Sequence, residues 1–163
     1  TQLQAAGAYW TAPTTGTLTV ENTATGNHDE HAVGAISFTG VDQTTPVGTA
    51  QTQTGTTGNA SVTVSDAGAD DLIVDFLYQY GITAPTIGAD QTLQNTQTMS
   101  GILFLRQSTQ AGSADDVMSW ATNTSIQWVY GAVAFKATAG VAAVLPGHGH
   151  LLAGRRNRLI QDV

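Results

Sequence analysis

The sequence predicts an all-β fold, an antiparallel β-sandwich of the jelly-roll type followed by an extended C-terminal arm. Short segments of alternating or continuous apolar residues recur along the first 137 residues, and clusters of Gly, Pro, Asn, Asp and Ser separate them. No apolar pattern with a helical period occurs before residue 140. We therefore predict a sandwich domain over residues 1–137 and an arm over residues 138–163.

Composition narrows the function classes. The 163 residues suit one domain that buries its own core. The chain has no cysteine, which excludes a disulfide framework, thiol catalysis and Cys-type zinc sites. Charged residues make up only 10% of the chain, so its polar surface comes from Thr, Gln, Ser, Asn and Gly. On such a surface, charge repulsion opposes the close assembly of subunits only weakly.

Charge is distributed unevenly along the chain. The net charge is −7, and before residue 141 the only cations are Arg106 and Lys136. An acidic body is a poor nucleic-acid binder, because neutralisation of phosphates drives that affinity. No apolar run approaches the roughly 20 residues that a membrane span needs. We therefore predict neither nucleic acid nor membrane as a partner.

The first half of the chain predicts strands joined by polar turns. Leu18 and Val20 alternate with polar residues in the first predicted strand. Residues 32–47 predict a second, buried strand that ends in a sharp corner. There, Asp42 can turn its carboxylate onto the amides of Gln43 and Thr44, and Pro46 fixes the exit. Residues 48–58 are rich in Thr and lack an apolar face, which predicts an edge or a surface excursion.

The second half predicts four further strands after the strand at residues 61–65. The apolar segments are residues 72–80, 101–107, 116–121 and 126–137. The polar segments between them, including the long stretch 81–99, predict loops and turns.

Asp75 interrupts the longest apolar segment. A buried carboxylate must be paired or protonated. Arg106 is the nearest partner by residue type, and the alternative is that Asp75 points to an edge. Either both faces of the strand are buried, or one face is buried and Asp75 points to an edge.

Three groups of residues could bind a metal, although solvated loops and turns are the simpler explanation of each. The imidazoles and carboxylates of residues 28–31, HDEH, are potential ligands, but the spacing is not that of a helical zinc motif. Acidic loops attract calcium, but turns also recruit Asp for local hydrogen bonds. The acidic loop residues are Asp66, Asp70, Asp71, Asp115 and Asp116. His148 and His150 in the arm could chelate a metal or remain polar tips. We predict no cofactor and no metal.

Aromatic residues near the last two strands could stack on sugar rings. Trp120, Trp128 and Tyr130 are the candidates, yet alternation places Trp128 and Tyr130 on one face, which favours a place in the core. No nucleophile motif or phosphate-binding glycine loop is present, and no acid–base pair converges. We therefore predict no enzymatic activity and no catalytic residue.

The arm carries the residues that we predict to bind a partner. Its apolar side chains would be costly to leave in water at about 25 cal/mol per Å². It therefore lies on a neighbouring subunit or folds back on its own sheet. Its arginines could grip carboxylates of an acidic neighbour or remain solvated. The predicted partner-binding residues are Leu151, Leu152, Arg155, Arg156, Arg158, Leu159 and Ile160.

Several segments resemble a β-sandwich module of bacteriophage virion proteins and of large bacterial surface or secreted proteins. They are SFTGVDQTTPVG at residues 37–48, SVTVS at 61–65, ADDLIVDF at 69–76, GADQTL at 88–93 and MSWATNTSIQWVYGAVAFKA at 118–137. The GVDQTTP corner is the most specific of them. Members of this type usually have further strands before the segment at residues 11–20, TAPTTGTLTV, which implies that the first sheet is incomplete unless a neighbour supplies a strand. No catalytic residue carries over from the resemblance.

From the resemblance and the arm we expect a structural protein of a phage particle, a capsid decoration protein or a head or tail fibre component. Its expected partners are copies of itself and other virion proteins such as the major capsid protein, and its expected location is the virion. The alternative is a carbohydrate-binding module of a bacterial cell-surface or secreted protein. That module would use Tyr or Trp side chains and calcium.

Overall fold

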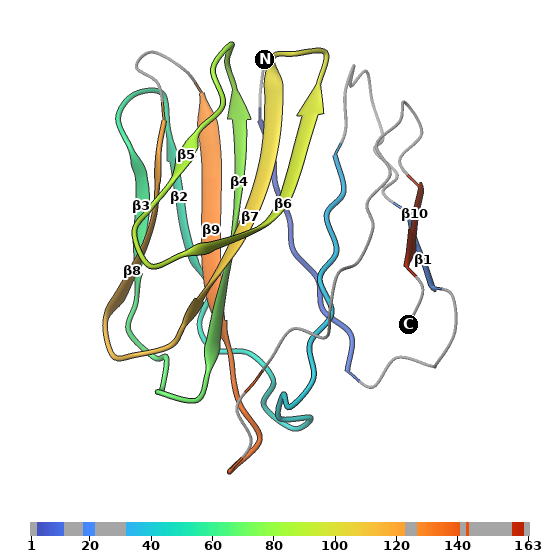
Figure 1. Cartoon of the computed structure of the whole chain (residues 1–163), viewed down its shortest axis with the longest axis vertical. Coiled ribbons are helices and arrows are strands. Elements are labelled where there is room, and N and C mark those ends of the chain that lie inside the picture. The colour runs from blue at the N-terminus through green and yellow to red at the C-terminus, as the bar shows by residue number, and fades with distance from the viewer. Residues whose placement is uncertain are drawn as a thin grey trace.

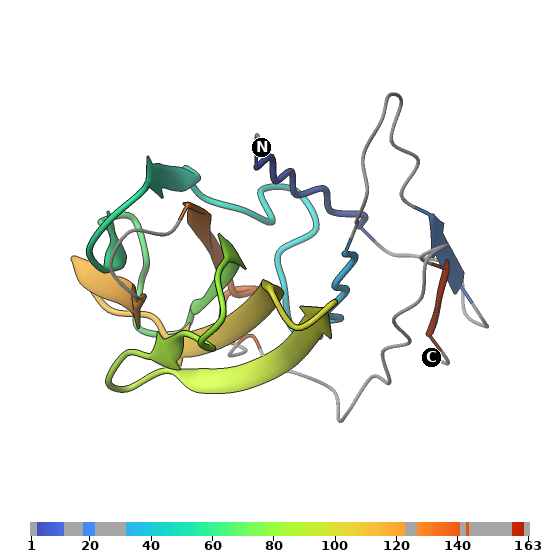
Figure 2. The same ribbon diagram turned by 90° about the horizontal axis from the view of Figure 1, so that it is seen from above.

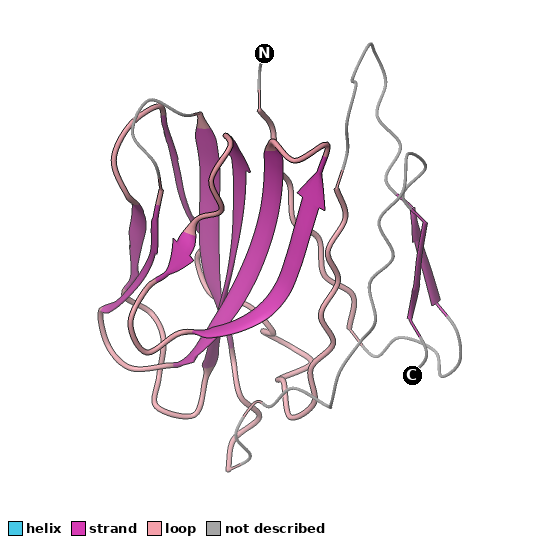
Figure 3. Cartoon of the chain, turned by 45° about the horizontal axis from the view of Figure 1, so that its top comes forward, coloured by secondary structure: helices cyan, strands magenta, loops and turns pink. Residues whose placement is uncertain are grey.

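The fold is known from a computed structural model that describes residues 3–11, 18–21, 32–122, 127–140, 143 and 158–161. At residues 18, 20, 21 and 158–161 it describes the backbone alone. All regular structure in these residues is β-strand (Figure 3). The described residues include no helix long and apolar enough to cross a membrane.

Ten strands make up the described structure (Figure 1). They are β1 (Leu18–Glu21), β2 (Gln51–Gly55), β3 (Ala60–Val64), β4 (Leu72–Tyr80), β5 (Thr86–Ile87), β6 (Thr92–Met99), β7 (Leu103–Ala111), β8 (Asp116–Ala121), β9 (Trp128–Phe135) and β10 (Arg158–Gln161).

Strands β2 to β9 form a sandwich of two antiparallel sheets. The larger sheet has five strands in the order β2-β9-β4-β7-β6, and the smaller has three in the order β3-β8-β5. The pairs β2·β9, β3·β8 and β4·β7 are nested along the chain, as if one long hairpin had been folded over. This nesting resembles the strand order of a jelly roll, but β5 and β6 belong to different sheets and do not pair. The prediction of an antiparallel β-sandwich is confirmed.

The main core lies between the two sheets. Alternate residues of β4, beginning with Ile73, face inward, and they meet inward residues of β9, β8 and β3. The buried apolar residues of this core are Ala60, Val64, Ala67, Ile73, Leu77, Met118, Trp120, Trp128, Tyr130, Ala132 and Ala134. The core therefore sits where the sequence alternates most regularly.

The outer face of the larger sheet is covered as well. Leu3 and Ala32 pack against Tyr78, Leu103 and Leu105. The extended segments 3–11 and 32–40 run beside this face (Figure 2). Burial of β4 on both faces, one of the two predicted arrangements, is therefore the correct one.

The predicted strand at residues 32–38 is wrong. These residues are half-buried and belong to none of the three sheets, and the Ala32 side chain packs against the larger sheet. The Phe38 ring, for example, packs against the ring of Phe135 at a centroid distance of 4.4 Å. All seven residues from 32 to 38 are half-buried, so their small and apolar side chains suit a segment that lies against a sheet without pairing in it.

The predicted corner after this segment is confirmed. One oxygen of the Asp42 carboxylate accepts hydrogen bonds from the amides of Thr44 at 2.7 Å and Thr45 at 2.9 Å. The carboxylate therefore binds the amides of the second and third residues after Asp42, whereas the prediction named the first and second. Pro46 is buried, and its carbonyl accepts a hydrogen bond from the Lys136 amide.

The loop predicted over residues 81–99 is also wrong, because it contains β5 and β6. Strand β6 pairs with β7 along its whole length, with a register shift between Leu93 and Asn95. It forms an edge of the larger sheet, and apart from Leu93 and Met99 it consists of Thr, Gln and Asn, so it lacks the apolar face by which a strand is recognised. By contrast, β2 lies within residues 48–58 and confirms that this segment is an edge.

Strands β1 and β10 form a separate two-stranded antiparallel ribbon, with Leu18 opposite Gln161 and Glu21 opposite Arg158. Neither strand is hydrogen-bonded into the sandwich sheets. Figures 1 and 2 both show the ribbon to one side of the sandwich. Strand β10 is the only described part of the predicted partner-binding segment.

Candidate functional site

The most concentrated polar chemistry of the described residues surrounds Asp75. This residue lies on the inward side of β4, opposite Ser108 of β7 and Ala132 of β9. Because residues on that side face the core, the side chain is 0% exposed. An unpaired carboxylate at such a position would cost several kcal/mol.

Both oxygens of Asp75 accept hydrogen bonds. The Oδ1 atom accepts from the Ser108 amide at 2.8 Å and from the Ser108 hydroxyl at 2.7 Å. The Oδ2 atom accepts from the Trp120 indole N–H and the Tyr130 hydroxyl, each at 2.8 Å, and from Gln91 Nε2 at 3.0 Å. These donors fill the acceptor capacity of a carboxylate.

Gln91 connects this cluster to the smaller sheet. Its Nε2 also donates to the Ser108 hydroxyl at 2.7 Å, and its Oε1 accepts from the Ser119 amide of β8 at 2.8 Å. Together with Trp120 of β8, it ties the two layers of the sandwich to one carboxylate. The cluster fixes how the sheets face each other.

The electrostatics of the cluster follow from burial. Desolvation raises the pKa of Asp75, although hydrogen bonds from Ser108, Tyr130 and Trp120 act in the opposite direction. Desolvation, with the neighbouring Asp75 charge, also raises the pKa of Tyr130. Since Asp75 has no exposed surface and no free acceptor, it is not placed to exchange a proton with a bound substrate. The arrangement suits a structural role.

The predicted pairing of Asp75 with Arg106 is wrong. The Arg106 guanidinium instead donates from Nη1 to the carbonyls of Gln97 at 2.6 Å and of its neighbour Leu105 at 2.9 Å. It also lies 5.0 Å from the centre of the Phe104 ring. Burial lowers its pKa. The long Arg106 side chain reaches strand β6 at the edge of the sheet instead. Asp75 is satisfied by neutral donors, which are Ser108, Trp120, Tyr130 and Gln91.

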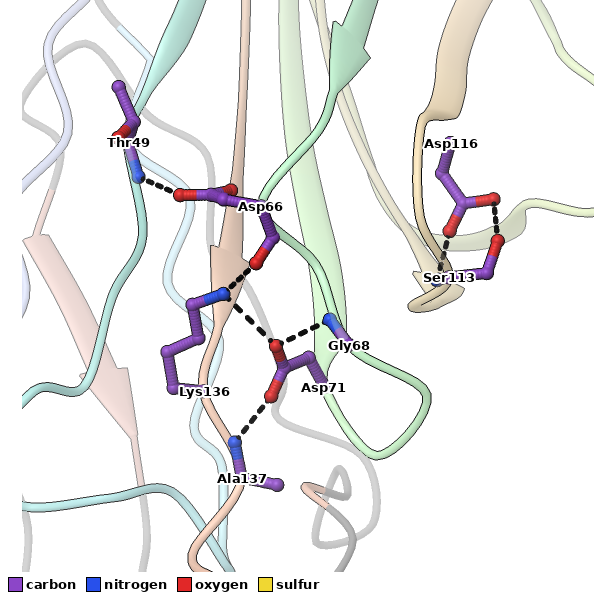
Figure 4. A network of polar contacts seen from close by, with 8 residues as sticks. All are labelled: Thr49, Asp66, Gly68, Asp71, Ser113, Asp116, Lys136 and Ala137. Atoms are coloured by element: carbon purple, nitrogen blue, oxygen red, sulfur yellow. Dashed lines mark hydrogen bonds and ion pairs between the residues drawn. The ribbon is translucent and has the colours of Figure 1, made fainter.

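A second polar network joins the loop after β3 to the end of β9 (Figure 4). The Lys136 ammonium lies 3.1 Å from Asp71 Oδ2 and donates to the Asp66 carbonyl. The Asp71 carboxylate also accepts from the amides of Gly68 and Ala137, each at 2.8 Å. Desolvation acts to raise the pKa of Asp71, but the hydrogen bonds and the Lys136 charge outweigh it and the pKa is lowered.

Two of the remaining acidic loop residues, Asp66 and Asp116, accept hydrogen bonds from other loop residues. Asp66 Oδ2 accepts from the Thr49 amide at 2.6 Å, and Asp116 accepts from the amide and hydroxyl of Ser113 (Figure 4). The described residues include no cluster of three or more potential metal ligands. Lys136 supplies the cation beside Asp71, which favours the local hydrogen-bonding interpretation over calcium.

The aromatic residues that were candidates for sugar stacking lie in the core. Trp120, Trp128 and Tyr130 are 1%, 3% and 0% exposed. The most exposed aromatic rings of the described residues lie instead in the N-terminal segment, where Tyr9 is 51% and Trp10 is 70% exposed. The alternation of β9 predicted the burial, whereas nothing in the sequence marks Tyr9 and Trp10 as exposed.

Several candidates lie outside the described residues. These are His28, Asp29, Glu30 and His31 of the HDEH loop, His148 and His150, and Leu151, Leu152, Arg155 and Arg156 of the arm. The structure places the backbone of Arg158, Leu159 and Ile160 in β10, opposite β1. Their role as partner-binding residues stays a prediction.

Sequence reasoning missed the donors that surround Asp75. Gln91 was assigned to a loop, and Trp120 and Tyr130 were considered as a sugar platform or as core. The available signal was chemical: a buried Trp or Tyr needs a partner for its N–H or O–H, and Asp75 is a buried acceptor. The number of residues between them in the chain gave no indication that they meet.

Comparison with known proteins gave no match to any family model, curated protein sequence or solved structure. The function must therefore be argued from the fold and from the chemistry of the described residues.

Proposed function

We propose that the chain is a non-enzymatic structural protein of a virus particle, in keeping with its resemblance to a module of phage virion proteins. The observation that carries the proposal is the nested strand order of the sandwich, because jelly rolls are the recurrent architecture of viral capsid domains. The same architecture also serves lectins and cupins, so further observations must choose among them.

Two properties of the described residues favour a building block. The buried polar groups around Asp75 bond one another and leave no functional group presented to a substrate. The surface is poor in charge, which lowers the electrostatic cost of packing copies closely. Both properties suit a rigid unit that is joined to others.

In this proposal the arm makes the contact that attaches one subunit to its neighbour. A two-stranded ribbon such as β1·β10 is marginal in water unless something covers it. A neighbouring subunit or the major capsid protein would supply that cover, with apolar arm residues such as Leu159 and Ile160 buried and the arginines placed on carboxylates. The body would remain exposed on the particle.

Truncation tests the role of the arm. A variant that lacks residues 144–163 keeps Ala143, which is 6% exposed and whose amide bonds to the Asp70 carbonyl at 3.2 Å. We expect this variant to fold like the full chain but to form no particles, rings or filaments in negative-stain electron micrographs. The full chain should form them. Assemblies of equal number and size from both proteins would refute the anchoring role.

A matched variant separates charge from apolar burial. The triple substitution Arg155→Gln, Arg156→Gln and Arg158→Gln keeps the length of the arm and its apolar residues. If the arginines bind carboxylates of a neighbour, this variant should assemble less than the full chain at low salt, and the difference should shrink at high salt, where the ion pairs are screened. Unchanged assembly would assign the contact to the apolar residues alone.

Exposed Tyr9 and Trp10 favour a second candidate function, a carbohydrate-binding module. Aromatic rings with a free face can stack on sugars. A glycan array, run with and without a chelator, tests it: a pure building block gives no signal in either condition. Any signal should be lost in Trp10→Ala, and binding that survives this substitution would remove the assignment to Trp10.

A further inference from the structure

Among the described residues, strand β2 is an edge of the larger sheet with no strand paired on its outer side. The ladder between β4 and β9 shows which of its backbone groups point outward. The Tyr80 amide donates to the Gln127 carbonyl, so odd-numbered residues of β9 bond toward β4 and even-numbered residues bond toward β2. The bond from the Gly48 amide to the Ala134 carbonyl agrees with this assignment.

The register of β2 with β9 then identifies the outward residues. Gln51, Gln53 and Gly55 stand opposite even-numbered residues of β9 and bond to them. The N–H and C=O groups of Thr52 and Thr54 therefore point away from the sheet. Within the part of the chain that the structure describes, no group bonds them.

This edge lacks the usual protection against pairing. Natural edge strands carry Lys, Pro, a bulge or an inward charge that keeps other chains away. Strand β2 has the sequence QTQTG, and no charged residue or proline occurs from residue 47 to residue 65. Edge strand β6, in comparison, has an irregular register between Leu93 and Asn95.

The strand is also complementary to itself. If two antiparallel copies are centred on Gln53, Thr52 of each faces Thr54 of the other. These are the residues whose backbone groups point outward, so each pair exchanges two hydrogen bonds, about four in all. The side chains that meet are Thr with Thr and Gln with Gln, pairs that stabilise sheets without charge.

We propose that β2 is the contact between two copies of this chain, which join their larger sheets into one across a two-fold axis at Gln53. This inference deepens the proposed function, because it names one contact between subunits, and it rests on that proposal only for the premise that copies associate. It uses the sandwich alone and requires no part of the arm.

Single cysteines test the register in the full chain, which has none of its own. Gln53 faces its own counterpart as a non-hydrogen-bonded pair, with Cα atoms about 4.5 Å apart, within disulfide range. Thr54 is equally exposed on the same strand, but its counterpart lies beyond the limit of about 7 Å. We expect Gln53→Cys to form a covalent dimer at least about tenfold faster under mild oxidation than Thr54→Cys.

A second pair of variants tests the backbone bonds. In the Gln53→Cys chain, Thr54→Pro removes an outward amide without touching the bonds to β9. Thr52→Lys with Thr54→Lys places like charges opposite each other. Both should abolish the rapid cross-link. If the proline variant does not fold, as judged by circular dichroism, the lysine variant still decides, because its changes lie at exposed positions.

The outcomes separate the two proposals. Equal cross-linking of Gln53→Cys and Thr54→Cys, or cross-linking that survives the two lysines, would overturn the β2 contact. Failure of the truncated chain to assemble while its Gln53→Cys form still cross-links supports both. Normal assembly by the lysine variant of the full chain would overturn the β2 contact and leave the proposed function standing.

Discussion

The Tyr130 hydroxyl on β9 donates a hydrogen bond of 2.8 Å to the Asp75 carboxylate on β4, although 55 residues separate them in the chain. Both side chains are fully buried. The bond joins adjacent central strands of the larger sheet and is one of the donor contacts that make a buried carboxylate tolerable.

Tyr130→Phe removes this donor and keeps the ring. Because it leaves a buried carboxylate short of one hydrogen bond, we expect the free energy of unfolding to fall by about 1–3 kcal/mol in urea titrations. The matched control is Tyr80→Phe on an exposed ring, with an expected change within about 0.5 kcal/mol. Equal effects of the two substitutions would contradict a structural role for the Tyr130 hydroxyl.

Because the pKa of Asp75 is raised, its contribution to stability should decrease as the pH rises. Asp75 holds its proton more tightly in the folded state than in the unfolded state, because burial disfavours its charge. Its contribution is fully present below the unfolded value, near 3.8, and is lost as the pH rises through the raised folded pKa. The free energy of unfolding of wild type minus that of Asp75→Asn should therefore decrease over that interval. An increase would show that the pKa is lowered.

Asp71 provides the opposite case in the same experiment. Its desolvation is outweighed by hydrogen bonds from Gly68 and Ala137 and by Lys136, so its pKa is lowered. Its stabilising contribution is present above the unfolded value and is lost as the pH falls through the folded pKa. The difference between wild type and Asp71→Asn should therefore shrink on acidification. A difference that grew on acidification would contradict the assignment.

Gly131→Ala should strain the outer face of the larger sheet. A Cβ atom at this position would lie 2.7 Å and 2.9 Å from atoms of the Phe76 ring. We expect the free energy of unfolding to fall by about 1–3 kcal/mol, as for other overpacked sites. Phe76→Leu in the same chain should recover part of the loss by making room. Gly68→Ala, where the nearest atom is 3.5 Å away, is the control and should change stability little.

Asp42→Ala should loosen the corner at residues 42–46. Without the carboxylate the amides of Thr44 and Thr45 lose their acceptor, so their hydrogen exchange, measured by NMR, should accelerate. Asp42→Asn keeps a side-chain oxygen and should largely preserve protection. Equal exchange in the alanine and asparagine variants would mean that the turn is held by Pro46 instead.

The sequence could predict those parts of the fold whose physics is local. The alternating residues of β3 and β8 and the continuous apolar residues of β4 gave strands close to their observed bounds. The Asp42 corner was also predictable, because a short carboxylate reaches only the next few amides. The sandwich class followed from the number and spacing of such segments.

Two errors in secondary structure have a common origin. Residues 32–38 have the alternation of a strand but lie across a sheet, and β6 pairs fully with β7 but has no apolar face. Apolar periodicity reports which side chains are buried. Backbone pairing is a different property. A polar edge strand is paired without an apolar face, and an extended covering segment is partly buried without being paired.

The amino-acid sequence by itself determined the class of fold, the strongest strands, the low charge of the surface and the basic, apolar composition of the arm. Only the tertiary structure decided what surrounds Asp75, where Arg106 and Lys136 find their acceptors, and which strands form the edges of the larger sheet. The physical reason is that propensity, periodicity and turn chemistry act over a few residues. Hydrogen bonds between residues 33 to 66 positions apart depend on which strands become neighbours, and packing of the whole chain settles that.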